Sequence, residues 1–312
     1  MGLLWSLMAI GVFITFRILE TPDLSVEGTV ILGAATAARL ISGGSNPFLA
    51  TALAMVVGSV GGLVTGILHT KFKIPPILSG ILTMVASYSV VIRIMGTSNV
   101  GLPPHGPMRV TSVFTFLQTW GLTRQVSVIL LGAVIVISVG TLTYCFFGTE
   151  IGSAIRATGN NRQMVKAQGV NTNVTIILCL MLSNALVGLA GSLVAQQQGF
   201  ASVDMGIGTI VIGLASVIIA EVLFRVRSFW GRLISIVIGS IIYRLIIALV
   251  LELGMAPTDL RLFMAITVAV ALTLPLIRDK VAKLFKKLKL RDKIAKLFKK
   301  LKKSKTDSNR GA

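Results

Sequence analysis

Nine long apolar runs constrain what this chain can fold into more than any other feature. Each run is close to the roughly 20 residues that a helix needs to cross a bilayer. The runs are too many for one soluble core, because 54% of the 312 residues are hydrophobic and only 13% are charged. They lie at residues 2–19, 24–43, 47–69, 75–96, 126–147, 173–196, 207–224, 230–250 and 259–277. The pattern predicts an all-α polytopic membrane protein with about 8–10 transmembrane helices.

The formal net charge of +19 does not by itself indicate nucleic-acid binding, because half of the cations lie at one end. Residues 278–310 hold 15 of the 30 Lys and Arg residues. Within them, 278–290 and 291–303 are two copies of one repeat that match at 11 of 13 positions. Each copy has an apolar stripe and a lysine face, which favours anionic inner-leaflet lipid; acidic partners or RNA are the alternatives. The chain thus divides into a transmembrane domain, 1–277, and a basic amphipathic cytoplasmic tail, 278–312.

Residues 148–171 form the longest polar stretch in the middle of the chain. Helical spacing of apolar residues in its two halves, interrupted at Gly159 and two asparagines, predicts two short surface helices around a tight turn. The alternative is a solvated loop that only links two spans. Because the Lys- and Arg-rich loops alternate along the chain, they predict that this stretch and the C-terminus are cytoplasmic and the N-terminus is outside.

A second polar segment, residues 18–35, lies between the first two apolar runs. Thr21 and Pro22 are typical of a helix start, with Asp23 in the first turn complementing the helix dipole. Glu27 follows one turn later. An acidic side chain inside a span needs a partner or water, so Glu27 indicates either a contact between helices or a polar lining.

The remaining ionisable residues within spans suggest structural roles first. Glu221 has Arg225 four residues later, which predicts a local ion pair. Arg244 lies deep in its span and is expected to face the protein interior or extend outward to the interface. Cys145 and Cys179 are expected to be reduced, small apolar packing residues.

Motifs for catalysis are absent from the sequence. It contains no GxxxxGK[ST] phosphate loop, no HExxH and no GxSxG elbow, and its acidic residues are too sparse for a transmembrane proton relay. We therefore expect no catalytic residue, no metal site and no cofactor in this chain. A membrane subunit without a motor must receive force from a soluble partner, and a compact cytoplasmic helix pair is suited to transmit it.

Three segments carry a resemblance to a known family. They are "PDLSVEGTVILGAA" (22–35), "GTEIGSAIRATGNNRQMVKAQGVNTN" (148–173) and "SNALVGLAGSLVAQQQGFASVDMGIG" (183–208). In this order they resemble permease subunits of ribose- and branched-chain-amino-acid-type ABC importers. The likeness runs from about residue 8 to 276. Within that superfamily, the first half of the chain is most similar to a subgroup associated with binding proteins for tryptophan and other aromatic amino acids.

The resemblance implies a type II-like importer permease in the plasma membrane that works as a homodimer. Its expected partners are two cytoplasmic ATP-binding subunits, which hold ATP and Mg, and an external substrate-binding lipoprotein. The expected solute is small and polar, such as an amino acid. The residues implied in coupling to the ATPase are Ile151, Ile155, Arg156, Asn160, Arg162, Met164, Val165 and Lys166. The candidates for the translocation path are Glu27, Ser79, Thr83, Ser87 and Ser216.

An ion-coupled secondary carrier is the main alternative. Residues 18–35 would then form a broken helix, with Glu27 as the ion site. Such carriers often contain inverted repeats, and the other half of the sequence shows no convincing second copy of this segment.

Overall fold

The computed structural model describes residues 1–102, 112–118, 120–224, 226 and 228–252, together with positions 262, 263, 265–267, 269 and 273. The chain divides into two units, Met1–Ala265 and Ile266–Ala312. The first unit is the transmembrane part described below. The expected basic tail, 278–312, lies outside the described residues.

Eight of the nine predicted apolar segments form helices, and the ninth, 259–277, lies largely outside the described residues. The eight are α1 (Gly2–Phe13, continued by the π-helical turn η1, Ile14–Ile18), α2 (Val26–Ser42), α3 (Pro47–Thr70), α4 (Pro76–Met95), α6 (Arg124–Gly148), α9 (Thr172–Gln198), α10 (Thr209–Leu223) and α11 (Phe229–Glu252). Among the described residues, six helices are long and apolar enough to cross a membrane; α1 with η1 and α2 are shorter.

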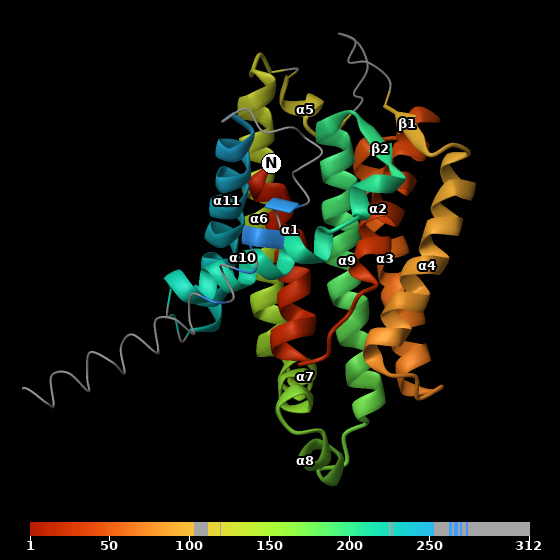
Figure 1. Cartoon of the computed structure of the whole chain (residues 1–312), viewed down its shortest axis with the longest axis vertical. Helices are drawn as coiled ribbons and strands as arrows, with labels where there is room; N and C mark the ends of the chain where they lie inside the picture. Colours follow the sequence, from red (N-terminus) through yellow and green to blue (C-terminus); the bar gives the residue numbers. More distant parts are fainter. Residues whose placement is uncertain are drawn as a thin grey trace, which may run out of the picture. The chain divides into compact units, whose positions relative to one another are not determined.

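Shorter elements connect these helices. They are the strands β1 (Asn99–Gly101) and β2 (Phe200–Ser202), the 3-10 turn η2 (Val203–Gly206), and the short helices α5 (Thr115–Gln118), α7 (Glu150–Asn160) and α8 (Arg162–Ala167). The two strands pair antiparallel, with Val100 opposite Ala201. They lie at the opposite end of the unit from α7 and α8, as Figure 1 shows.

Helix α9 is the central helix of the unit. All of its residues from 183 to 196 are buried, and glycines of α2 and α3 lie against its backbone at the closest points. A methyl group added at Gly33 of α2 would overlap the carbonyl group of Gly188, and one at Gly62 of α3 would overlap that of Leu180. The glycines at these contacts therefore serve close helix packing, as small residues do in membranes.

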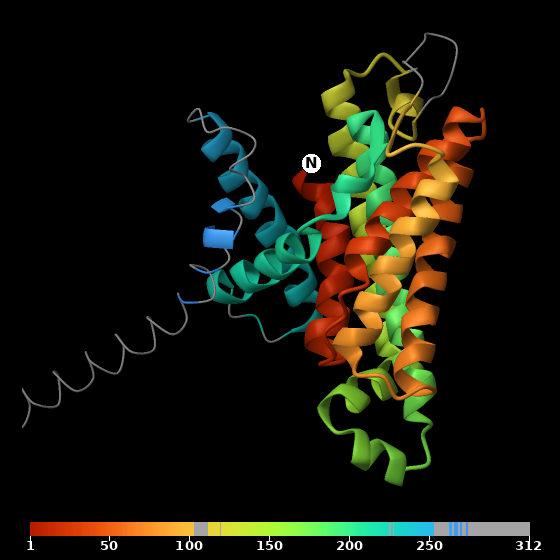
Figure 2. The same ribbon diagram turned by 45° about the vertical axis from the view of Figure 1, so that its right-hand side comes forward.

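Helix α1 lies between α9 and the pair α10–α11, as the views in Figures 1 and 2 agree. The Ser183 hydroxyl of α9 donates to the Gly11 carbonyl of α1 at 2.7 Å. The Ser240 hydroxyl of α11 donates to the Gly2 carbonyl at 3.0 Å. The Arg244 guanidinium lies 4.4 Å from the ring centre of Trp5, so the expectation that Arg244 faces the protein interior is confirmed.

The start of α2 differs from the sequence prediction. Thr21, Pro22 and Asp23 do not begin the helix, which starts at Val26, and residues 19–25 are irregular. Local bonds replace the helical ones, because the Ser25 N–H donates to Asp23 Oδ1 at 2.8 Å and the Thr21 hydroxyl donates to the Leu19 carbonyl at 3.2 Å. Short polar side chains commonly compete with helix formation in this way.

Helices α3, α4 and α6 expose many apolar side chains, as expected of surfaces that face lipid. Cys145 belongs to this exposed surface on α6, so its predicted packing role is wrong. Cys179 on α9 is a free thiol and is fully buried, so the packing prediction is confirmed for that residue.

Candidate functional site

Helices α7 and α8 project beyond the ends of the long helices in Figure 1. Each helix begins with a side-chain cap. Thr149 Oγ1 accepts from the Gly152 N–H at 3.2 Å, and Asn161 Oδ1 accepts from the Met164 N–H at 3.0 Å. Asn161 alone separates the two helices, which confirms the predicted pair of short helices around a tight turn and excludes a simple loop.

The inner face of this helix pair packs against the spans. Ile155 and Val165 are 0% and 1% exposed, so both hold α7 and α8 in place, and their part in coupling to the ATPase stays a prediction. At Gly159 the backbone of α7 touches the carbonyl group of Ile18, and an added methyl group would overlap it. The α7–α8 pair is therefore fixed against the end of α1 and η1.

Two arginines of the pair are also tied to the membrane part. Arg156 Nη2 donates to the Phe147 carbonyl at 2.7 Å, and its guanidinium lies 5.7 Å from the ring centre of Phe229. Arg162 Nη2 donates to Thr21 Oγ1 at 2.9 Å. These side chains connect α7 and α8 to α6, to α11 and to the irregular segment 19–25, so their first role is internal.

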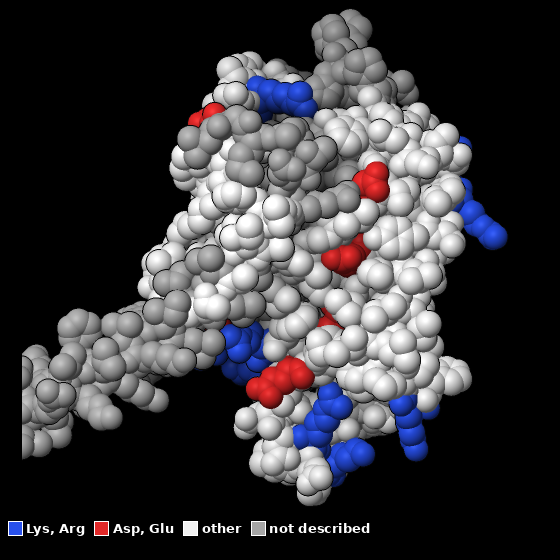
Figure 3. Space-filling model, viewed as in Figure 1, with Lys and Arg blue, Asp and Glu red and all other residues white. Residues whose placement is uncertain are grey.

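The outer face retains two of the predicted coupling residues, Met164 and Lys166, which are exposed, Met164 at 45%. Arg156 and Asn160 are exposed as well, but both line a cavity with α1, η1 and α11. Ile151 is also exposed, but it borders an apolar groove formed with α3 and α9, and so lies toward the spans. Figure 3 shows basic side chains gathered at this end of the unit. This tip combines an exposed thioether with amide and ammonium groups, which is suited to contact another protein.

A buried polar cluster follows directly after Thr21. Asp23 Oδ2 accepts from Asn184 Nδ2 at 2.8 Å, and the Ser25 hydroxyl donates to Asn184 Oδ1 at 3.2 Å. Asp23, Ser25 and Asn184 are each 1% exposed or less. The cluster joins segment 19–25 to the central helix α9. A continuous set of contacts therefore runs from α8 through Arg162 and Thr21 to α9.

Glu27 makes a contact between helices, which was one of its two predicted roles. Glu27 Oε1 accepts from the Gly208 N–H at 3.0 Å, at the residue before α10. A carboxylate at the N-terminus of a helix is favourable because it opposes the positive end of the helix dipole. Glu27 is half-buried and joins the first turn of α2 to α10.

The model of the family described as branched-chain amino acid transport system / permease component matches residues 1–273. The chain belongs to this family. It is 42% identical over 267 residues to the tyrosine transport system permease protein of Clostridioides difficile (strain R20291), covering 86% of each chain. It is 25% identical to the ribose import permease protein RbsC of Escherichia coli (strain K12), covering 76% of this chain and 71% of the relative. No solved structure matches the chain.

Four of the predicted path residues of this ABC importer permease are buried between its own helices. Ser79, Thr83 and Ser87 of α4 and Ser216 of α10 are all at most 4% exposed. Thr83 Oγ1 accepts from the Thr65 hydroxyl of α3 at 2.9 Å, and Ser87 packs against Gly28 of α2. In the conformation described they therefore lie within the packed unit, and their place on a translocation path stays a prediction.

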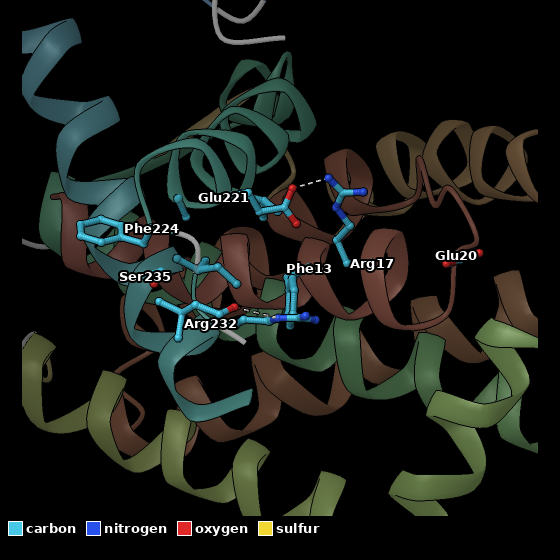
Figure 4. A pocket seen from close by; sticks show the side chains of 11 residues that line it. Phe13, Arg17, Glu20, Glu221, Phe224, Arg232 and Ser235 are labelled. Carbon is cyan, nitrogen blue, oxygen red and sulfur yellow. Dashed lines mark hydrogen bonds and ion pairs between the residues drawn. The ribbon is translucent and has the colours of Figure 1, made fainter. Parts of the chain in front are cut away.

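The ion pair predicted between Glu221 and Arg225 stays a prediction, because Arg225 lies outside the described residues. In the permease structure, Glu221 pairs with Arg17 in η1, and both line the cavity drawn in Figure 4. Arg17 is the single cation within the first apolar run, and this isolation is the signal that it needs a distant partner. Nearby, Glu20 has φ of 53°, a left-handed conformation that costs a non-glycine residue about 1–2 kcal/mol.

The sequence alone did not identify Asn184 as part of the buried polar cluster of the permease. An asparagine within a 27-residue apolar helix is a signal, because a side-chain amide in a membrane needs a partner. Its partner, Asp23, is 161 positions away in the sequence, and spacing along the chain gives no indication of such a pair.

Proposed function

We propose that this permease moves an amino acid, with aromatic side chains preferred, across the plasma membrane, using ATP that two partner subunits hydrolyse. ATP and Mg bind to those subunits, and this chain contributes no catalytic residue. The family places the chain among importer permeases, and the tyrosine permease relative supports the class of solute.

One observation carries this proposal: the α7–α8 pair is fixed to the spans on its inner side and exposed on its outer side. The inner side is held by buried Ile155 and Val165 and by the Arg162–Thr21 bond. The outer side presents Met164 and Lys166 to a partner. A rigid element of this kind can transmit a movement of the ATP-binding subunit to segment 19–25 and to α9.

The proposed assembly contains two copies of this chain, two ATP-binding subunits and an external substrate-binding lipoprotein. The distribution of Lys and Arg supports a cytoplasmic α7–α8 end, a cytoplasmic C-terminus and an N-terminus outside. The basic tail then lies where anionic inner-leaflet lipid is available. Of the five predicted path residues, Glu27 is the one that keeps a partly exposed polar side chain, so we retain it as a path candidate.

Docking is tested by replacing the outer face of α8. Met164→Glu combined with Lys166→Glu is expected to abolish co-purification of the cognate ATP-binding subunits and ATP-driven uptake of labelled tyrosine into proteoliposomes. Lys71→Glu is the matched control, since it changes an exposed lysine in the α3–α4 loop at the same end of the unit. The control should keep both activities.

Two results would contradict the proposal. The first is full co-purification and uptake with the double variant, which would make the α7–α8 pair a simple connection between spans. The second is uptake by this chain alone that is driven by an ion gradient without ATP, which would identify a secondary carrier.

A further inference from the structure

Three exposed aromatic side chains lie together at the β1–β2 end of the unit. They are Phe48 of α3, Phe116 of α5 and Trp120, which are 46%, 44% and 75% exposed. The Phe48 and Phe116 rings meet edge to face with their centres 5.9 Å apart, and the Phe116 and Trp120 ring centres are 6.4 Å apart. We call these three residues the aromatic cluster. The proposed docking and path residues include none of them.

The segment that carries two of the three rings is fixed from its inner side. Val113 and Phe114 are each 2% exposed. The Val113 N–H donates to Gln196 Oε1 of α9 at 2.8 Å, and Gln196 Nε2 donates to Thr51 Oγ1 of α3 at 2.8 Å. Residues 112–118 are therefore tied to two long helices, and the aromatic cluster is a defined surface on the opposite side of this segment.

The aromatic cluster lies where two spans begin. Helices α3 and α6 are both long and apolar enough to cross a membrane. Phe48 is the second residue of α3, and Trp120 precedes the first residue of α6 by four positions. Figure 1 draws α5 at the same end of the unit as β1 and β2. Since the hydrocarbon of a bilayer gives way to headgroups at the ends of spans, the cluster lies at the level of that boundary.

The surface next to the aromatic cluster is apolar and continuous with it. Leu49, Leu53 and Val60 follow Phe48 along α3, at spacings that place them on one side of a helix, and they are 56%, 40% and 51% exposed. This side of α3 belongs to the surface expected to face lipid. The aromatic cluster is therefore the end of a lipid-facing stripe and not an isolated patch.

The chemistry of the aromatic cluster and of its loop also fits a lipid boundary. Phenylalanine is apolar throughout, whereas tryptophan combines a large apolar ring with one N–H donor, and such rings are enriched at the headgroup level of membranes. Residues 97–125 contain Arg109 and Arg124 but no Asp or Glu. The loop thus has no carboxylate that would be repelled by anionic headgroups.

We propose that the aromatic cluster binds the boundary between headgroups and hydrocarbon of the bilayer, with the glycerol-ester region of phospholipids as its ligand. Phe48 and Phe116 pack on the first methylene groups of the acyl chains, and the Trp120 N–H donates to an ester or phosphate oxygen. In the proposed orientation this is the outer leaflet. Segment 112–118 is then held between the bilayer and Gln196 of the central helix, and its outward side is not available to a soluble partner.

The test uses the fluorescence of Trp120 in the full chain in lipid nanodiscs. The chain has three tryptophans, so Trp5→Phe combined with Trp230→Phe leaves Trp120 as the single emitter. Lipids that carry bromine near the glycerol should quench Trp120 at least about twofold more strongly than lipids that carry bromine near the bilayer centre. Iodide in the aqueous phase should quench it weakly.

The matched control keeps Trp5 as the single emitter, through Trp120→Phe and Trp230→Phe. Trp5 is 5% exposed and lies between helices, so neither brominated lipid should quench it appreciably. Gel filtration shows whether each variant is folded. If the loss of Trp5 prevents folding, Trp120→Phe alone answers the question, because its difference from the unaltered chain in lipid-quenched emission is the contribution of Trp120.

A charge placed in the aromatic cluster should weaken its contact with lipid. In the chain that retains only Trp120, Phe116→Asp should shift the emission to longer wavelength and increase iodide quenching at least about twofold, because a carboxylate is costly at the edge of the hydrocarbon. Phe72→Asp is the matched control. Phe72 is 68% exposed in the loop after the other end of α3, so its change should leave the emission of Trp120 as it was.

Three results would overturn the inference: equal lipid quenching of Trp120 and Trp5, stronger quenching from the bilayer centre than from the glycerol region, or iodide quenching as strong as that of free tryptophan. Protection from iodide that develops only when an external binding protein is added would identify a protein-docking surface and would also overturn it. The assay contains no solute and no ATP-binding subunit. Its outcome is therefore independent of the proposed function.

Discussion

Two polar interruptions of this apolar chain, segment 19–25 and the α7–α8 pair, look alike in sequence but have opposite surroundings. Both contain short polar side chains and lie between apolar runs. Segment 19–25 enters the unit, where Thr21, Asp23 and Ser25 are all buried. The α7–α8 pair projects from it and exposes one face. The difference shows that the burial of a polar segment depends on its partner. Segment 19–25 is buried because Asn184 bonds to its side chains, whereas the outer face of α7–α8 meets solvent or a second protein.

The comparison predicts that changes in the buried segment affect stability, whereas changes in the outer face of α8 affect partner binding. The largest effect is expected for Asn184→Leu. It leaves the buried Asp23 carboxylate without the donor at 2.8 Å, which should cost about 2–3 kcal/mol of unfolding free energy. Thermal unfolding in detergent measures this loss. Asn173→Leu is the control, because Asn173 is an exposed asparagine on the same helix. An equal loss of unfolding free energy in both variants would show that the buried cluster does not stabilise the fold.

The next effect concerns the point where the two regions touch. Gly159→Ala places a methyl group onto the Ile18 carbonyl, so we expect a loss of about 1–3 kcal/mol, typical of overpacking. Gly148→Ala is the matched control because its added methyl group has nothing within 4 Å. If both alanines lower the unfolding temperature equally, the loss does not come from the contact between the regions.

A smaller effect is expected for the bond that joins the regions. Thr21→Val, Arg162→Gln and the double variant form a mutant cycle across the 2.9 Å contact. The coupling free energy should be about 1–2 kcal/mol, as for a part-buried hydrogen bond from a charged group. Additive changes in unfolding free energy would mean that α8 and segment 19–25 are energetically independent.

The smallest stability effect is expected on the outer face. Met164→Ala should change the unfolding free energy by less than about 0.5 kcal/mol, because the side chain is half exposed. Its neighbour Val165→Ala should cost about 1–2 kcal/mol, because Val165 is 1% exposed. In co-purification with the ATP-binding subunits, Met164→Ala should lower the yield although it leaves stability unchanged. The opposite ranking of the two variants in stability would contradict the assignment of faces.

Sequence periodicity predicted the helices well because a long apolar run indicates a helix in an apolar environment without reference to any other segment. It also predicted the break between α7 and α8, since asparagine at the turn caps the second helix. It did not separate Ile155 from Met164, because which face of a short helix is inward depends on what packs against it. Pairs such as Asp23 with Asn184, or Arg17 with Glu221, join residues far apart in the sequence, and no local pattern marks them. The serines of α4 and α10 illustrate the same limit, because a polar stripe can satisfy a neighbouring helix as readily as a solute.

The glycine contacts between α2, α3 and α9 have a consequence for where a solute can travel. At Gly33, Gly62 and Gly188 the backbones of these helices are in direct contact. Neither water nor an amino acid can pass between α2, α3 and α9 there unless the helices separate. Helices α2, α3 and α9 therefore form one tightly packed group. A solute must pass outside this group, and Glu27, which contacts the start of α10, is the path candidate on its α2 side.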